Sequence, residues 1–251
     1  MRELRAIIFD LGDTLIYFDA AIQDVLGEAD EVLYRSLVAQ GLNLEKASFL
    51  GEYRSRMNAY FAERDSEFIE HTTFYILSEV LKAFEVNDLP EGLLRAALRD
   101  MYTVFENYWI PEAESVPVLQ ELQKRGYHLG LVSNASDDDD VQTLVDKAGI
   151  RPYFDRIITS AVAGIRKPNP RIFQTLFQAW ELRPDQVAMV GDTLGADILG
   201  ARNAGMYGIW VTRRADNAGN RAHRETIHPD AIVENISELP GLLGLITLPA
   251  Q

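Results

Sequence analysis

The sequence predicts an α/β protein in which an all-helical segment interrupts a parallel β-sheet. Three observations lead to this prediction. Residues 4–10 form a short, nearly continuous apolar run, as in strands that are buried on both faces. Residues 17–110 show helical periodicity instead, and after Pro111 strand-like runs alternate with helical ones. This alternation is typical of right-handed βαβ units, and therefore of a parallel sheet covered by helices.

The inserted segment is expected to contain four helices, because its apolar residues recur at three- and four-residue spacing. Gly41 follows the first run as a typical helix stop, and Pro90 lies where proline is favoured, near the start of the fourth helix. The four apolar runs span 25–37, 50–61, 69–84 and 94–105.

The remainder of the chain is expected to complete the sheet and its helices. Gly126, Gly149 and Gly205 each follow a helical run at the position of a C-terminal stop. The expected strands are 127–132, 156–160, 187–191 and 207–211, with a weaker one at 231–234. The expected helices are 114–125, 138–148, 170–181 and 195–204. These runs predict a core domain from residues 1–16 plus 112–251 and a helical domain from residues 17–111.

Composition narrows the classes of function. The 251 residues carry a net charge of −14, and no basic run is longer than Arg213-Arg214, which disfavours nucleic-acid and anionic-membrane surfaces. There is no cysteine, so disulfides and thiolate metal sites are excluded. No apolar run is long enough to span a membrane, and the N-terminal one is too short for a signal peptide, so a cytoplasmic location is expected.

Polar residues follow the ends of the first two predicted core strands. Asp10-Leu11-Gly12-Asp13-Thr14 would place a carboxylate in a cleft beside backbone N–H groups, or Asp10 would only cap a turn. Ser133 and Asn134 would hydrogen-bond an oxyanion, or would likewise cap a turn. Because parallel strands end at one edge of the sheet, Asp10, Ser133 and Asp192 are expected to converge there.

Two further motifs carry charge. Lys167 precedes Pro168 and Pro170, which stiffen its segment; it would orient a carboxylate and neutralise phosphate, or simply be solvated. Asp192 ends the strand at 187–191, and Asp197 follows five residues later. Carboxylates in this setting suit Mg²⁺, although acidic residues are also favourable at any helix N-terminus.

The order of these four motifs resembles the haloacid dehalogenase (HAD) superfamily, subfamily I, with its phosphoglycolate-phosphatase-like members. The resemblance implies a Rossmann-like core, a helical cap inserted after the first motif, and a small phosphorylated substrate. It implies that Asp10 forms an aspartyl-phosphate, with Lys167 and Ser133 also catalytic. It assigns phosphoryl binding to Thr14, Ser133, Asn134 and Lys167. It assigns Mg²⁺ to Asp10, the Gly12 backbone carbonyl and Asp192, with Asp197 supporting them.

One departure from the family pattern concerns the acid–base residue. The family's phosphatases usually read Asp-x-Asp-Gly-Thr, whereas this chain reads Asp-x-Gly-Asp-Thr. Gly12 keeps a backbone carbonyl for a metal but cannot exchange a proton, a function worth about 10²–10⁴-fold in rate. Asp13 would take over this role if the turn is rearranged, or would cap the turn.

The departure leaves other functions open. Carbon–halogen hydrolysis would need a cap arginine, for which Arg35 is the nearest candidate. Phosphonate cleavage would need a buried cap lysine, and the cap holds only Lys46 and Lys82. A non-catalytic binding module is the alternative from another class.

Three other features of the sequence have both a functional and an ordinary structural interpretation. Residues 137–140 are four consecutive aspartates, expected at a helix N-terminus rather than in a calcium loop. His71 would meet substrate or be an ordinary cap histidine. The polar segment 213–228 is expected to be a long loop at the far end of the core.

Overall fold

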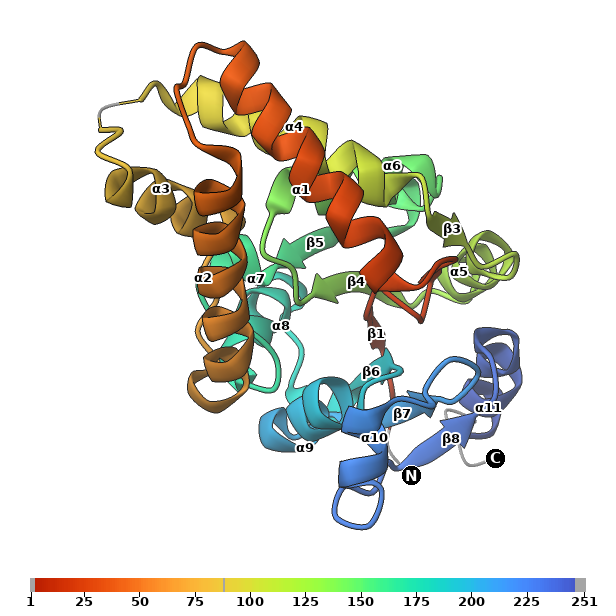
Figure 1. The fold of residues 1–251 in the computed structure, drawn as a ribbon. Coiled ribbons are helices and arrows are strands. Elements are labelled where there is room, and N and C mark those ends of the chain that lie inside the picture. Colours follow the sequence, from red (N-terminus) through yellow and green to blue (C-terminus); the bar gives the residue numbers. More distant parts are fainter. Residues whose placement is uncertain (1–2, 88, 247–251) are drawn as a thin grey trace.

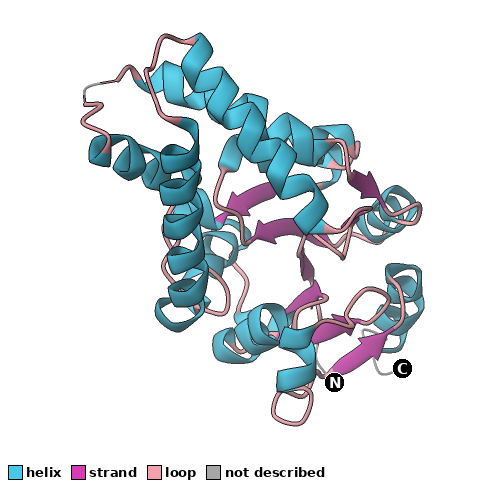
Figure 2. Ribbon diagram, viewed as in Figure 1, coloured by secondary structure: helices cyan, strands magenta, loops and turns pink. Residues whose placement is uncertain are grey.

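The computed structural model describes residues 3–87 and 89–246, and its centre is a six-stranded parallel sheet (Figures 1 and 2). The strand order is β5-β4-β1-β6-β7-β8, so the N-terminal strand lies inside the sheet. The bounds are β1 Ala6–Phe9, β4 His128–Ser133, β5 Arg156–Thr159, β6 Val187–Gly191, β7 Tyr207–Val211 and β8 Ala231–Val233. The predicted α/β class is confirmed. Each expected strand is present, and its ends lie within two residues of the expected ones.

Both faces of the sheet are covered because the side chains of β1 alternate between two apolar clusters. Ile7 and Phe9 pack with one set of helices, and Ala6 and Ile8 pack with the other. The first set comprises α5 Ser115–Lys124, α6 Asp138–Lys147 and α11 Leu239–Ile246. The second set comprises α8 Gln174–Trp180 and α9 Leu199–Ala204. A strand buried on both faces explains the continuous apolar run in the sequence.

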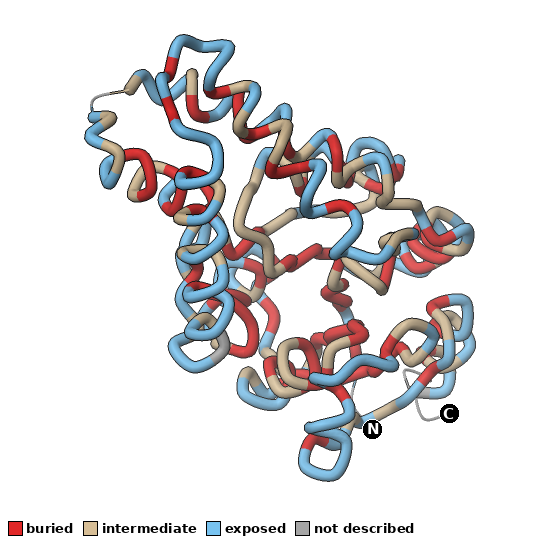
Figure 3. Tube along the Cα trace, viewed as in Figure 1, coloured by how far each residue is buried: buried red, intermediate tan, exposed pale blue. Residues whose placement is uncertain are grey.

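The segment between the first strand and residue 109 folds into four helices with an apolar cluster of their own. Their bounds are α1 Ile22–Ala39, α2 Lys46–Glu67, α3 Thr73–Ala83 and α4 Glu91–Glu106. Leu33, Phe49, Leu77 and Leu98 are buried between them, and the buried positions lie on the inner sides of the helices in Figure 3. None of the described helices is long and apolar enough to cross a membrane.

A short antiparallel pair, absent from the sequence-based prediction, links the helical segment to the core. β2 Ile16–Phe18 pairs with β3 Trp109–Pro111. Arg214, from the C-terminal part of the core, lies 3.6 Å above the Tyr17 ring and forms an ion pair of 2.5 Å with Glu112. The two chain crossings are therefore held together and tied to the core.

A second attachment joins the end of α2 to the loop that precedes Lys167. The backbone amide of Arg166 donates to the carbonyl of Phe68 (3.0 Å), and that of Glu70 donates to Gly164 (3.2 Å). The buried Glu70 carboxylate accepts hydrogen bonds from Tyr60 and, at 2.6 Å, from Ser160, and lies 3.5 Å from the Arg166 guanidinium. The helical segment is thus fastened to the core at both places, and Lys147 adds a further contact by donating to the Glu106 carbonyl at 2.6 Å.

Candidate active site

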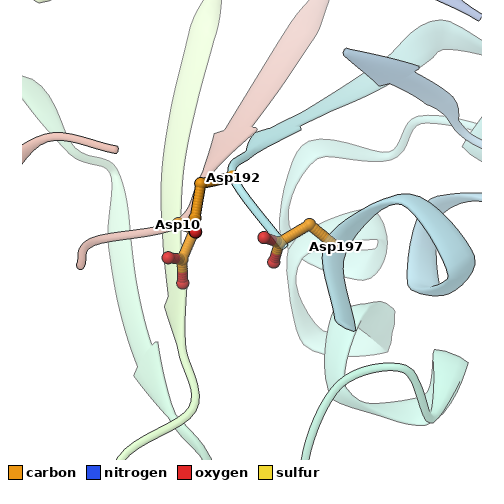
Figure 4. Close-up of side chains that lie close together, drawn as sticks. All are labelled: Asp10, Asp192 and Asp197. Carbon is orange, nitrogen blue, oxygen red and sulfur yellow. The ribbon is translucent and has the colours of Figure 1, made fainter. Parts of the chain in front are cut away.

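A polar cavity of about 550 Å³ opens where β1, β4 and β6 end. We call it the Asp10 cavity. Asp10 enters it directly after β1, Ser133 ends β4, and Asp192 follows β6. The structure therefore brings together the three residues that the sequence predicted to converge at this edge (Figure 4 shows two of them).

Lys167 is buried at the centre of this site. Its Nζ lies 2.5 Å from Asp10 Oδ1 and 2.8 Å from Asp197 Oδ1, and it donates to the Val132 carbonyl at 2.7 Å. Burial lowers the pKa of Lys167, but the carboxylates of Asp10 and Asp197 outweigh it and hold this pKa above its ordinary value. The ammonium therefore stays charged, and its short contact fixes the position of the Asp10 carboxylate.

Asn134 lines the cavity and also holds Lys167 in place. Its side-chain Nδ2 donates to the Lys167 carbonyl (3.0 Å), and its Oδ1 accepts from the Lys167 amide (2.8 Å). Thr14 is buried, and it is not among the described residues that line the Asp10 cavity. Of the four residues expected to bind phosphoryl oxygens, Ser133, Asn134 and Lys167 thus line the Asp10 cavity.

Three carboxylates meet in the cavity: Asp10, Asp192 and Asp197 have oxygens within 4.8 Å of one another (Figure 4). Burial, partly offset by Lys167, raises the pKa of Asp10 to about 6. Burial and the charges of Asp197 and Asp10 raise the pKa of Asp192 to about 9. Three buried carboxylates face one ammonium, so the site has excess negative charge.

A hard divalent cation such as Mg²⁺ fits this set of donors. Oxygen ligands and one or two carboxylates are what Mg²⁺ prefers, and a cation would offset the charge of the buried group. Asp197 already uses Oδ1 toward Lys167 and accepts from the Thr193 amide at 2.9 Å. A Cβ on Gly191 would overlap the Asp197 carboxylate, which explains glycine before Asp192. Asp10 and Asp192 keep oxygens that could hold a metal, while both oxygens of Asp197 are engaged by Lys167 and the Thr193 amide.

The turn after Asp10 differs from the expected pattern in a way that the structure explains. Gly12 lines the cavity, and a Cβ at this position would lie 3.2 Å from Cη2 of Trp109. The indole therefore occupies space that a side chain would need. Asp13 has a left-handed backbone (φ 54°), and its carboxylate accepts a hydrogen bond from the Phe18 amide. Burial raises the pKa of Asp13, although Arg214 works against this.

The segment 213–228 is placed differently from the prediction of a loop at the far end of the core. Asn217, Gly219 and His223 line the Asp10 cavity, and α10 Ala218–His223 lies within the segment. Asn220 is buried there: its Nδ2 donates to the Asp192 carbonyl (2.9 Å), and its Oδ1 accepts from the Leu194 amide (2.7 Å). Sequence reasoning missed these residues, because a short polar helix carries no apolar periodicity.

The aspartate run behaves as expected, with one exception. Asp137 caps α6 by accepting from the Asp140 amide (3.0 Å). Oδ1 of Asp140 is buried and has no hydrogen-bond partner among the described residues. Burial, together with the charges of Glu106 and Asp137, raises the pKa of Asp140 to about 8. Asp140 also lines the Asp10 cavity, so it is more than a helix-end charge.

Residues considered for other chemistries lie away from this cavity. The Arg35 side chain is 65% exposed and pairs with Glu31. Lys46 and Lys82 are half or more exposed and pair with neighbouring glutamates. His71 stacks on Tyr75 and lines a separate, smaller cavity.

Comparisons with known proteins agree with this geometry. A family model described as haloacid dehalogenase-like hydrolase matches residues 4–205. The glyceraldehyde 3-phosphate phosphatase of Methanothermobacter thermautotrophicus is 29% identical over 96% of this chain and 100% of its own length. A 2-haloacid dehalogenase from Pseudomonas syringae pv. Tomato DC3000 superposes with a TM-score of 0.66 and 25% identity, covering 97% of this chain and 99% of that one. A HAD phosphatase from Thermococcus onnurineus superposes with a TM-score of 0.63 and 24% identity, covering 96% and 98%.

Proposed function

Because the chain belongs to the haloacid dehalogenase-like hydrolases, we propose that it is a Mg²⁺-dependent phosphatase that forms a covalent intermediate on Asp10. The observation that carries this proposal is the buried Lys167, held between Asp10 and Asp197 beside a further carboxylate. Lys167, together with a cation held by the carboxylates, would balance the charge of a dianionic phosphate. The relative named as a glyceraldehyde 3-phosphate phosphatase supports the same chemistry.

In the first step, an Asp10 oxygen attacks phosphorus and the bond from phosphorus to the leaving oxygen breaks, its electron pair leaving with that oxygen. Lys167 orients Asp10 and balances charge on the phosphoryl oxygens, and the Ser133 hydroxyl donates to one of them. In the second step, water attacks phosphorus, the bond to Asp10 breaks, and phosphate and the free carboxylate result. The proton of the attacking water passes to solvent.

Asp10, Asp192 and the Gly12 carbonyl would hold Mg²⁺, with Asp197 supporting the ligands. Bound there, Mg²⁺ supplies positive charge to the phosphoryl oxygens and neutralises the excess carboxylate charge. Residues 17–111 would act as the cap and residues 1–16 plus 112–251 as the core, so that the substrate lies between them.

Protonation of the leaving group is the weak point of this enzyme. Gly12 has no side chain for it, and the Asp13 carboxylate is engaged by the Phe18 amide and faces Arg214. We therefore assign Asp13 to capping the turn. Substrates whose leaving oxygen is stable as an anion are the ones that such a site turns over.

The alternative chemistries have less support. Dehalogenation is named in a relative of similar fold, but Arg35 is exposed and lies outside the Asp10 cavity; an arginine of the helical segment that does line this cavity is Arg64. Phosphonate cleavage needs a desolvated amine, and neither Lys46 nor Lys82 is buried. A pure binding module has no need for a buried nucleophile, lysine and metal acids together.

The proposal is tested with acetyl phosphate and p-nitrophenyl phosphate, with Mg²⁺ or with EDTA. We expect metal-dependent release of phosphate by the wild type and none by Asp10→Asn. Equal turnover by Asp10→Asn, or none by the folded wild type with Mg²⁺, would refute it.

A further inference from the structure

A second cavity, of about 830 Å³, lies among α1, α2 and α4, next to the Asp10 cavity. We call it the helical cavity. Trp109 and Asp140 line both cavities, so the two lie side by side at these residues. Its volume falls in the range that holds an organic molecule. A molecule with its phosphate at Asp10 could therefore extend past Trp109 into the helical part.

The lining of the helical cavity is mostly apolar and in part exposed to water. Ile22, Leu26 and Phe61 are 42–43% exposed at its rim. Grouped apolar side chains of this kind typically mark a binding surface. The deeper wall comprises Phe18, Tyr53, Met57, Met101 and Phe105.

The charges that line the helical cavity favour a neutral occupant. Asp30 and Arg54 also line it, but they form an ion pair of 2.5 Å with each other. Asp140, at the junction, has a buried oxygen without a hydrogen-bond partner among the described residues, and burial raises its pKa to about 8, so it offers no charge to bind an ionic group near neutral pH. The part of the substrate that enters the helical cavity is therefore neutral and apolar.

From these features we infer that the substrate is an aryl phosphate monoester, with its aromatic group in the helical cavity. The inference rests on the proposed phosphatase function. It explains why Trp109 stands over Gly12: the indole offers an aromatic surface where an acid–base side chain would otherwise lie.

The leaving group of such a substrate matches the missing acid. When Asp10 attacks, the electron pair of the broken P–O bond goes to the phenolic oxygen, which leaves as a phenolate and takes a proton from water. A phenolate is stable enough to leave without an acid beside it, whereas an alkoxide is not. The apolar cavity and the glycine at position 12 thus point independently to the same class of substrate.

The test compares phenyl phosphate with 2-naphthyl phosphate, whose leaving groups differ little in acidity but differ in apolar area. We expect a KM for 2-naphthyl phosphate that is lower by about tenfold, a usual gain for added apolar contact in a pocket. Leu26→Gln should remove most of this preference, measured as the ratio of kcat/KM for 2-naphthyl phosphate to that for phenyl phosphate. Val38→Gln is the matched control, since Val38 lies on the same helix, is 40% exposed and does not line the helical cavity.

Binding gives a readout that does not depend on turnover. We expect 2-naphthylmethyl phosphonate, which the enzyme cannot hydrolyse, to bind the wild type about tenfold more tightly than Leu26→Gln in calorimetry. If acetyl phosphate is hydrolysed but neither the naphthyl preference nor its dependence on Leu26 is seen, the substrate inference is wrong and the phosphatase proposal stands. If the phosphonate binds with this dependence but no phosphate ester is turned over, the phosphatase proposal fails instead.

Discussion

Placing a carboxyl group at position 12 should shift the preference of the enzyme from aryl phosphates toward alkyl phosphates. In Gly12→Asp, the new side chain would supply a proton to the leaving group, a function worth about 10²-fold or more. The added Cβ would lie 3.2 Å from Cη2 of Trp109, closer than ordinary contact, so the indole must move by a few tenths of an ångström. Overpacking of this size costs about 1 kcal/mol, or roughly fivefold in rate if it falls on the transition state.

The net effect depends on the leaving group. For alkyl phosphates, which need a proton, kcat/KM should rise by about twentyfold, the hundredfold gain less the fivefold loss. For 2-naphthyl phosphate, which needs no proton and contacts Trp109, kcat/KM should fall by about fivefold. The plot of log(kcat/KM) against leaving-group pKa should therefore be steep for the wild type and shallow for Gly12→Asp.

Gly12→Asn is the matched control, because it has the same bulk without an acid. It should lose activity on 2-naphthyl phosphate to the same extent and gain nothing on alkyl phosphates. If Gly12→Asp behaves like Gly12→Asn on every ester, a missing acid does not limit this enzyme and the reasoning from Gly12 is refuted.

Three further predictions concern buried charges. Lys167→Met should lower kcat/KM for acetyl phosphate by about 10²–10³-fold and should also lower the Tm, because the carboxylates of Asp10 and Asp197 lose their cation. The control is Lys124→Met: Lys124 is exposed, and its replacement should change neither kcat/KM nor the Tm. Asp140→Asn should stabilise the protein increasingly between pH 5 and pH 8. The pKa of about 8 keeps folded Asp140 protonated, whereas the unfolded carboxyl ionises above about pH 4. The wild type therefore loses stability as the pH rises from 5 to 8, and the variant does not. An equal Tm difference between variant and wild type at pH 5 and pH 8, measured by circular dichroism, would contradict this. Glu70→Gln removes a charge partner of the buried Arg166 guanidinium. The loss should lower the free energy of unfolding by about 3 kcal/mol and the Tm by about 6–12 °C. An unchanged Tm would mean that this ion pair does not stabilise the fold.

The sheet and the meeting of Asp10, Ser133 and Asp192 were predictable because short-range signals encode them. Apolar runs identify buried parallel strands, and the carboxyl ends of such strands share an edge. Lys167 was also predictable as a partner of Asp10, since two prolines fix its segment and the motif order is specific.

Other features had no such signal. β2 and β3 are three residues each, too short to show alternation, and their aromatic residues resemble the helical pattern around them. The Glu70–Arg166 pair joins residues 96 positions apart, and either residue alone looks like an ordinary surface charge. Asn220 and its hydrogen bond to the Asp192 carbonyl depend on how the last part of the chain folds back. Long-range polar contacts of this kind are set by the tertiary fold.

The contacts that attach the helical segment to the core decide how substrate can reach Asp10. The segment is attached to the core both at β2–β3 and at Phe68–Glu70, so it cannot open as a lid that is hinged at one edge. Hydrogen bonds from Thr73 to the Ser136 carbonyl and from Lys147 to the Glu106 carbonyl add further contacts, so the segment is held against rotation on the core. Substrate should therefore enter by a route that breaks none of these contacts, through the rim of the helical cavity formed by Leu26 and Phe61. A substrate that entered by this rim would lead with its phosphate, so that the phosphate reaches Asp10 while the apolar part stays in the helical cavity.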